Sequence, residues 1–200
     1  MFDRGDSTNA PLEIARIEAG VAAACLGAKL HYLVKTDSTN KVARRLAENG
    51  AGHGAIVIAE EQSQGRGRLG RTWVSPPYCN LYFSMVLRPV LAPAHAPQIT
   101  LMAAVALADA IAAFIPVVPA IKWPNDILVD GKKLAGILTE SSCSSERLDF
   151  VILGIGVNLN FPLQAMPPEI RARASSLLAL RGDAVDRESF ILRLIQDLNR

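Results

Sequence analysis

Three glycines and three arginines share one short polar segment, Gln62-Ser63-Gln64-Gly65-Arg66-Gly67-Arg68-Leu69-Gly70-Arg71-Thr72-Trp73. Glycine lets the backbone take a positive φ angle or approach a ligand closely. Guanidinium groups carry a permanent charge on a planar fork that suits phosphate and carboxylate. Three such groups in one loop repel each other unless an anion lies between them. Residues 62–73, called the arginine loop below, therefore predict a flexible cationic loop that binds a phosphate-bearing ligand.

The spacing of Gly65, Gly67 and Gly70 also matches the dinucleotide-binding fingerprint, but its context does not fit that motif. A dinucleotide-binding loop follows a strand and opens a helix whose N-terminus holds the pyrophosphate. Residues 55–59 do read as a buried strand, yet residues 71–77 contain two prolines and β-forming residues where the helix should begin. No Gly-Lys-Ser/Thr ending follows either, which excludes a P-loop.

Three further segments carry residue types suited to the same chemistry: Asp37-Ser38-Thr39-Asn40, Lys122-Trp123-Pro124-Asn125-Asp126 and Lys132-Lys133-Leu134-Ala135-Gly136. Each also has a simpler interpretation when taken alone. Residues 38–40 can be a helix cap, tryptophans can fill the rim of a core, and lysines after a turn are usually solvated. The four segments together are far more specific than any one of them.

The composition indicates one globular domain without a metal cage. A chain of 200 residues, half of them apolar, can bury roughly 70% of its unfolded surface. The formal net charge of +2 provides no field for non-specific binding to nucleic acid or membranes. Three cysteines without paired spacing and three scattered histidines predict a reducing cytoplasm and no protein-built metal site. The apolar run 99–121 contains an aspartate and two prolines, so we expect a buried helix followed by a strand rather than a membrane span.

Periodicity and turn signals predict a single α+β domain over residues 1–200, with a mixed, largely antiparallel sheet flanked by helices. Helices are expected after Pro11 until Gly27, at 39–49, 97–114 and 168–180, and from Asp186 onward. Strands are expected at 30–35, at 81–88, where alternation indicates a half-buried strand, and at 150–153. Asp130-Gly131 between two apolar runs is a strong hairpin signal.

Taken as one set, these segments resemble the catalytic domain of biotin protein ligases, which join biotin to a lysine of a carboxylase carrier domain. The motifs that carry the resemblance are Asp37-Ser38-Thr39-Asn40, Gln62 with Gly65-Arg66-Gly67-Arg68-Leu69-Gly70-Arg71-x-Trp73, Asn80-Leu81-Tyr82, Lys122-Trp123-Pro124-Asn125-Asp126, Lys133-Leu134-Ala135-Gly136-Ile137-Leu138 and Gly154-Ile155-Gly156-Val157-Asn158. They occur in the family's order, and the family's fold is class II synthetase-like. The resemblance implies a fold of that kind for this chain.

The resemblance also implies a two-step reaction. Biotin and magnesium ATP give biotinyl-5′-AMP and pyrophosphate, and a lysine of the biotin carboxyl carrier protein then takes the biotinyl group. By similarity, Arg68, Lys133 and Asp126 are the catalytic residues, with Asp126 orienting Mg²⁺ together with the substrate phosphates. Arg66 and Arg68 would hold the biotin carboxylate and the α-phosphate, and Arg71 would reach the leaving phosphates. Such preorganised charge is usually the largest catalytic contribution.

The binding residues implied by similarity form two overlapping sets. Those for biotin are Ser38, Thr39, Asn40, Gln62, Gly65, Arg66, Gly67, Arg68, Lys133, Gly136, Gly154 and Gly156. Those for ATP are Arg66, Arg68, Arg71, Trp73, Lys122, Asn125 and Asn158. Gly154 and Gly156 are two apart on one strand face and are expected to leave a flat gap for biotin, and Trp73 is expected to stack on adenine. An acyl-adenylate must be kept from water, so the arginine loop is expected to order around it.

The ends of the chain depart from the family pattern. Only 36 residues precede Asp37, too few for the winged helix-turn-helix of the members that repress transcription, so no DNA binding is expected. The chain ends at Arg200, where most members continue into a small SH3-like barrel. Two alternatives stay open: a lipoate ligase or lipoyl/octanoyl transferase of the same fold, and a catalytically weak biotin-binding module. The sequence also leaves open whether the protein forms a homodimer.

Overall fold

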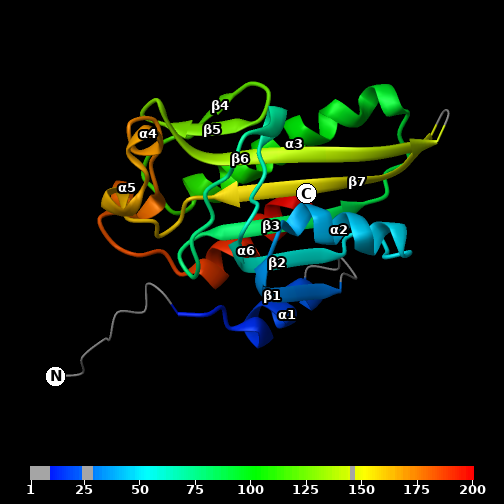
Figure 1. Ribbon diagram of the computed structural model, residues 1–200, viewed down its shortest axis with the longest axis horizontal. Helices are drawn as coiled ribbons and strands as arrows, with labels where there is room; N and C mark the ends of the chain where they lie inside the picture. The colour runs from blue at the N-terminus through cyan, green and yellow to red at the C-terminus, as the bar shows by residue number, and fades with distance from the viewer. Residues whose placement is uncertain (1–9, 24–28, 145–146) are drawn as a thin grey trace.

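The computed structural model describes residues 10–23, 29–144 and 147–200, which fold around one seven-stranded sheet with the order β1-β2-β3-β7-β6-β5-β4 (Figure 1). The strands are β1 (Leu30–Thr36), β2 (Ile56–Gln62), β3 (Leu81–Leu87), β4 (Ala120–Lys122), β5 (Asp126–Val129), β6 (Lys132–Ser144) and β7 (Arg147–Val157). β1 pairs with β2 in parallel, and the other neighbours pair antiparallel. The predicted α+β class with a mixed, largely antiparallel sheet is confirmed.

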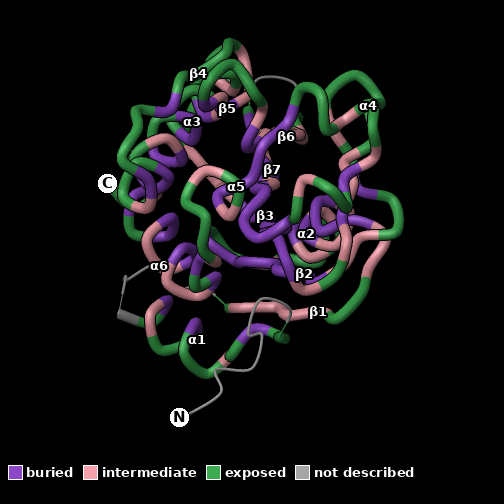
Figure 2. Tube along the Cα trace, turned by 90° about the vertical axis from the view of Figure 1, so that its left-hand side faces the viewer, coloured by how far each residue is buried: buried purple, intermediate pink, exposed green. Residues whose placement is uncertain are grey.

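Helices cover both faces of this sheet. They are α1 (Ile14–Ala23), α2 (Thr39–Glu48), α3 (Ala96–Ala112), α4 (Pro168–Arg171), α5 (Leu177–Arg181) and α6 (Arg187–Leu198). In Figure 1, α2 lies in front of the sheet and α3 behind it, and α4 and α5 lie at one end. Figure 2 shows the buried central strands as a purple core, with the edge strand β4 exposed at its rim. The layers are therefore helix, sheet, helix.

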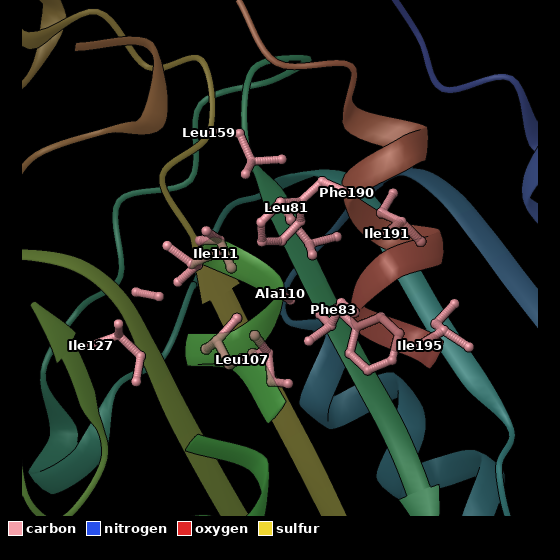
Figure 3. Packing of buried hydrophobic residues seen from close by; sticks show 14 of the residues in the cluster. Leu81, Phe83, Leu107, Ala110, Ile111, Ile127, Leu159, Phe190, Ile191 and Ile195 are labelled. Atoms are coloured by element: carbon pink, nitrogen blue, oxygen red, sulfur yellow. The ribbon is translucent and has the colours of Figure 1, made fainter. Parts of the chain in front are cut away.

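The larger core lies between the sheet and α3 with α6. Figure 3 shows Phe83 of β3 beside Leu107 of α3 and Ile195 of α6, all of them fully or almost fully buried. Alternate residues of one strand face the same layer, so the odd-numbered residues of β3 supply this core. Burying one such side chain contributes roughly 1.5–3 kcal/mol. The opposite layer is smaller, and there Ala43 and Ala47 of α2 pack against β2 and β3.

Two predicted elements differ in the structure. The strand predicted as half-buried, β3, is buried on both faces because α2 covers Ser84 and Val86, and the buried Tyr82 donates its hydroxyl to the Pro76 carbonyl. The single helix predicted at 168–180 is wrong, since it is two short helices, α4 and α5, separated by residues that pair with Lys133. Ser176 opens α5 by accepting a hydrogen bond from the Ala179 amide. The predicted helix end at Gly27 lies outside the described residues.

The apolar run 99–121 behaves as expected. α3 together with the turn before it, Pro93–Ala112, is the one helix in the described part of the chain that is long and apolar enough to span a membrane. Its Ala103, Leu107 and Ile111 are buried in the core against the sheet. The strand β4 follows it. The predicted buried helix followed by a strand is confirmed.

The hairpin and one helix start also follow the local sequence. Asp130 and Gly131 have φ angles of 50° and 74°, so both adopt the left-handed conformation of a type I′ turn between β5 and β6. This turn delivers Lys132 and Lys133 at the start of β6. Asp186 caps α6 by accepting a hydrogen bond from the Ser189 amide at 2.6 Å, as the predicted start of that helix requires.

A buried ion pair joins β2 to α6. Arg187 donates to Glu60 at 2.7 Å, and Glu60 is fully buried. Glu60 also accepts hydrogen bonds from the Leu12 amide and the Tyr32 hydroxyl, and Arg187 donates to the Ala10 carbonyl. Burial, together with the Glu60 carboxylate, raises the pKa of Tyr32, so this hydroxyl stays protonated and can donate. The pair thereby fixes the segment before α1 to the sheet.

Candidate functional site

A small cavity of about 50 Å³ opens on the α2 face of the sheet, under the arginine loop. Strands β3, β6 and β7 form its floor, the start of α2 forms one wall, and the arginine loop covers it. Predicted site residues that line it are Ser38, Thr39, Asn40, Gln62, Arg66, Gly67, Arg68, Trp73, Asn125, Lys133, Gly136, Gly154 and Gly156. Segments separated by more than a hundred residues in sequence therefore meet in one cavity, as the motif analysis expected.

The arginine loop is a tight hairpin. Trp73 donates its amide to the Gly65 carbonyl at 2.9 Å, and Gly67 donates to the Arg71 carbonyl at 2.7 Å. The turn at its tip is the short 3₁₀ segment Arg68–Gly70, in which Leu69 has a φ of 59° and Gly70 of 72°. Of the loop glycines, which permit a positive φ, Gly70 adopts one, whereas Gly67 is extended. As expected after Gly70, no α-helix follows the loop.

Gly65 instead permits close backbone approach. A Cβ at this position would collide with the Trp73 carbonyl and would lie 2.6 Å from Ser75 Oγ. Gly65 is buried between these groups. This glycine therefore closes the base of the hairpin against the residues that follow it.

The flat gap expected over β7 is filled by two side chains. The Asn40 amide occupies the space above Gly154, where a Cβ would collide with Asn40 Oδ1. The Trp73 indole occupies the space above Gly156, where a Cβ would lie 2.7 Å from Trp73 Cε2. The indole Nε1 is buried and has no hydrogen-bond partner among the described residues. The two glycines thus let an amide and an indole lie flat on the sheet.

Polar side chains from α2, β2 and β3 hold each other on the cavity wall. Gln62 Oε1 accepts hydrogen bonds from the Thr39 amide at 2.9 Å and from its hydroxyl at 3.2 Å. The Gln62 amide nitrogen is 3.0 Å from Ser75 Oγ. Ser84 Oγ lies 2.8 Å from Thr39 Oγ1 and 2.7 Å from Asn40 Oδ1. These groups supply both donors and acceptors, which recognition of a buried urea would require.

The start of α2 carries a carboxylate beside this wall. Ser38 occupies the N-cap position, as the sequence allows, but its side chain makes no capping bond. Instead Asp37 accepts a hydrogen bond from the Ser38 amide at 2.7 Å. Burial works to raise the pKa of Asp37, but the hydrogen bonds from Ser38, Lys41 and Thr36 outweigh it and leave this pKa below its usual value. Asp37 is therefore ionised at neutral pH.

Lys133 is the best-anchored cation of the cavity. Its amide donates to the Arg173 carbonyl at 2.8 Å, and its carbonyl accepts from the Ser175 amide at 2.9 Å. Its Nζ lies 2.6 Å from Asp126 Oδ1 and 5.4 Å from the centre of the Trp73 ring. Two backbone hydrogen bonds to the segment 173–175 and an ion pair at the tip of the side chain fix where this charge lies.

The guanidinium of Arg66 is also paired. Its Nη1 lies 3.1 Å from Glu140 Oε1, and Glu140 Oε2 accepts a hydrogen bond from Asn40 Nδ2 at 2.9 Å. In contrast, Arg68 forms no ion pair among the described residues, although it lines the cavity. The two loop arginines over the cavity therefore differ in the charge they leave available.

Five predicted site residues do not line the cavity: Gly65, Arg71, Lys122, Asp126 and Asn158. Arg71 and Lys122 are exposed on the loop and on β4. Asp126 contacts the site through Lys133. Asn158 is buried and donates to the Ser175 carbonyl at 2.9 Å, so its side chain anchors the segment that clamps Lys133.

The motifs contain four lining residues that were given no site role, namely Tyr82, Ile137, Leu138 and Ile155. Sequence reasoning missed Ser75, Phe83, Ser84 and Glu140 altogether. A signal for some of them was present. Side chains two apart on a strand share a face, so Gly136 predicts Leu138 and Glu140 on the same side of β6. The register confirms this relation, because Gly136 lies opposite Gly156 and Leu138 opposite Gly154.

A second, larger cavity of about 470 Å³ adjoins the first. It lies between the start of α3 and the other side of β6, with Trp123 at its edge. Arg68 and Asn125 line both cavities, and Asn125 bridges to β6 by donating to the Ile137 carbonyl at 2.9 Å. The site under the arginine loop is thus open on the side of Arg68.

Several curated proteins and solved structures similar to this chain are named as biotin ligases. A bifunctional ligase/repressor BirA of Bacillus spizizenii is 39% identical over 92% of this chain, and a biotin–[acetyl-CoA-carboxylase] ligase of Paracoccus denitrificans is 46% identical over 80% of it. The chain spans 57% of the Bacillus protein and 67% of the Paracoccus protein. The biotin protein ligase of Aquifex aeolicus, solved with biotin and ATP, matches with a TM-score of 0.71 and 33% identity over 85% of this chain and 68% of that chain.

The matched region contains the whole cavity floor. The model of the biotin/lipoate A/B protein ligase family matches residues 32–158, which is more than half of the chain. These residues include Ser38, the arginine loop, Lys133 and Gly156. The seven-stranded sheet with its flanking helices agrees with the class II synthetase-like fold of the solved ligases. This chain therefore belongs to the biotin/lipoate A/B protein ligase family.

Proposed function

We propose that the protein activates biotin with ATP to form biotinyl-5′-AMP and then transfers the biotinyl group to a lysine of a biotin carboxyl carrier protein. The observation that carries this proposal is that Arg68 and Lys133 line one cavity with the polar wall of Thr39 and Gln62. The names of similar proteins support it, since the Bacillus and Paracoccus relatives are ligases and the Aquifex enzyme was solved with biotin and ATP.

The first step needs the cations. The biotin carboxylate must attack the α-phosphorus, and two unit charges 4 Å apart repel by about 4 kcal/mol at an effective dielectric constant of 20. Lys133 and Arg68 would offset this repulsion, because both side chains line the cavity. Arg71 would act on the leaving pyrophosphate from the exposed side of the loop.

Biotin would lie along the polar wall. A urea ring presents two N–H donors and one carbonyl acceptor. Ser38, Thr39, Asn40 and Gln62 supply complementary groups at the inner end of the cavity. Gly65 and Gly67 keep the loop backbone close, while Gly136, Gly154 and Gly156 keep the floor flat.

The arginine loop would have to open for the substrates to enter. The cavity has room for little more than a water molecule or two, whereas small-molecule pockets usually measure about 300–1,000 Å³. Trp73 and Arg66 belong to the loop and fill much of this space. We infer that the indole of Trp73 leaves Gly156 and stacks on adenine, while the closing loop excludes water from the acyl-adenylate.

The residues present fit a magnesium ion that enters with the nucleotide. Mg²⁺ usually binds one or two carboxylates and completes its shell with substrate phosphates and waters. Asp126 would supply the carboxylate, since it lies 2.6 Å from the Lys133 amine at the edge of the cavity. The ion would neutralise phosphate charge when bound. Asn125 and Lys122 would add polar and positive groups nearby, and Asn158 would hold the segment behind Lys133.

Two further statements belong to the same proposal: the acceptor lysine is part of a biotin carboxyl carrier protein, and the protein is located in the cytoplasm. They follow from the names of the relatives and from the absence of paired cysteines in the sequence. Among the alternatives, a lipoate-specific enzyme shares the family model, but the Paracoccus relative and the Aquifex structure named above are biotin ligases.

Biotin-dependent exchange of label between pyrophosphate and ATP tests the proposal. Exchange that requires biotin supports it, because the adenylate step is reversible. Exchange that requires lipoate instead would favour the lipoate-specific alternative. Tight biotin binding without any exchange would indicate a binding module and would contradict the proposed activity.

A further inference from the structure

Glu140 is a largely buried carboxylate behind the cavity wall, in contact with Arg66 and Asn40, and the proposed reaction provides no role for it. It lies on β6 on the same face as Gly136, and 17% of its side chain is exposed. One carboxylate oxygen lies 3.1 Å from Arg66 Nη1, and the other accepts a hydrogen bond from Asn40 Nδ2 at 2.9 Å. Both oxygens are therefore used, one by the arginine loop and one by α2.

We infer that Glu140 is a positioning residue that ties the arginine loop to the cavity wall. It fixes the Arg66 guanidinium near the base of the loop and orients the Asn40 amide over Gly154. This inference rests on the proposed function, because the loop is taken to cover biotinyl-AMP. A carboxylate beside an anionic substrate would repel it unless a cation neutralised it, and Arg66 provides that cation.

The tie reaches both ends of the loop through one chain of hydrogen bonds. From Glu140 the chain passes through Asn40 to Ser84, whose hydroxyl lies 2.7 Å from Asn40 Oδ1. Ser84 lies 2.8 Å from the Thr39 hydroxyl, and Thr39 donates to Gln62.

The chain then continues to the far end of the loop. The Gln62 amide nitrogen is 3.0 Å from Ser75 Oγ, and Ser75 donates to the Trp73 carbonyl at 3.0 Å. The same side chains that would contact biotin therefore connect Arg66 at the start of the loop with Trp73 at its end. Biotin binding and loop closure would be coupled through this chain.

The loop arginines differ in whether a carboxylate already pairs with their charge. Arg66 shares its charge with Glu140, whereas Arg68 and Arg71 form no ion pair among the described residues. Of these two unpaired arginines, Arg68 is the one that lines the cavity and can stabilise the reacting anions. Arg66 acts as the cationic half of a neutral tie, so changes at Arg66 and Glu140 should open the loop to the same extent.

The test compares Glu140→Gln, Arg66→Gln, the double variant and Glu61→Gln as a matched control. Glu61 is also a strand carboxylate in one ion pair, with Lys35 at 2.7 Å, outside the cavity. Trypsin cleavage after residues 68 and 71, mapped by mass spectrometry without added substrates, reports opening of the loop. We expect about fivefold faster cleavage in Glu140→Gln and in Arg66→Gln, which is typical for the loss of one partly exposed ion pair. The double variant should be cleaved no faster than either single variant, because both substitutions remove the same ion pair.

Steady-state exchange kinetics give a second readout that a merely structural role would not change. We expect the KM for biotin to rise about fivefold in Glu140→Gln, with kcat within twofold of the parent protein. Arg66→Gln is compared by cleavage alone, because Arg66 itself lines the cavity. Glu61→Gln should match the parent in both assays. A fall in kcat at unchanged KM would place Glu140 in the chemical step and overturn the inference.

Other outcomes also decide the matter. Equal cleavage of Glu140→Gln and Glu61→Gln, or effects of the two site variants that multiply in the double variant, would refute the tie. Should Glu140→Gln lose its cooperative thermal transition, Arg66→Gln carries the test, because 45% of the Arg66 side chain is exposed. If the parent protein shows no biotin-dependent exchange, the proposed function fails, while the cleavage rates still decide whether Glu140 holds the loop.

Discussion

Replacing Lys133 with glutamine tests the proposed chemistry most directly. The backbone of Lys133 is held by Arg173 on one side and Ser175 on the other, so the substitution leaves the strand in place. The side chain loses its charge and its 2.6 Å contact with Asp126. Glutamine is similar in length to the removed chain and remains polar, so the main change is electrostatic.

The size of the effect follows from the charges in the cavity. Carboxylate and α-phosphate repel by about 4 kcal/mol at 4 Å and an effective dielectric constant of 20. If Lys133 and Arg68 share the compensation, losing one costs about 2 kcal/mol, or about 30-fold in rate. Removing one preorganised donor from an active site costs about 100- to 1,000-fold. The uncompensated Asp126 carboxylate adds repulsion in the same direction, so we expect a loss of about 30- to 1,000-fold in kcat.

Biotin-dependent pyrophosphate exchange measures this loss, and the chain offers a matched control. Lys132 is the neighbouring residue on β6, is exposed and does not line the cavity. Lys132→Gln should keep exchange within about twofold of the parent protein, as surface substitutions usually do. An exchange rate in Lys133→Gln within threefold of the parent, or an equal loss in Lys132→Gln, would refute the assignment of Lys133.

Three further predictions concern stability and packing. Arg187→Met leaves Glu60 buried and unpaired, so urea unfolding should show a loss of about 3–5 kcal/mol, and replacing both residues with apolar ones should recover most of it; an unchanged unfolding midpoint would contradict this. Burial works to raise the pKa of Asp186, but its hydrogen bonds from Arg16 and Ser189 leave it lowered. Its stabilising contribution is therefore present above the unfolded pKa of about 3.9 and lost as the pH falls through the lower folded value. Asp186→Asn should flatten the acid limb of a stability–pH curve, and an unaltered limb would count against the ion pair. Gly156→Ala places a Cβ 2.7 Å from the indole of Trp73, so tryptophan emission should shift to the red as the ring is displaced; emission identical to the parent would show that the ring does not lie there.

Short-range signals predicted most of the fold. The Asp130-Gly131 turn, the cap at Asp186 and the long apolar helix were all readable because each depends on residues close together in the sequence. The two-sided burial of β3 was not, because α2 covers its second face and that packing joins residues some forty positions apart. Strand alternation alone reads such a strand as half-buried.

The cavity was predictable to the extent that motifs mark it. Ser38, Gln62, Arg68 and Lys133 line it as expected, but the conformations of these segments depend on contacts that no motif states. The loop glycines permit a positive φ and Gly70 adopts one, but no motif indicates that Leu69 does so as well.

The break in the helix predicted at 168–180 shows how tertiary bonds build this site. Its residues favour a helix, but Arg173 and Ser175 give their backbone groups to Lys133 instead. Two backbone hydrogen bonds to a neighbouring strand replace helical ones, so the exchange costs little. In return, the segment pairs with Lys133 along the edge of β6 that β5 does not occupy, and Asn158 anchors that segment in turn. The local helix preference of residues 172–176 is therefore overridden by the hydrogen bonds that fix the position of the Lys133 charge. A substitution at Asn158 should accordingly change the site by displacing Lys133, and not by removing a contact between Asn158 and a substrate.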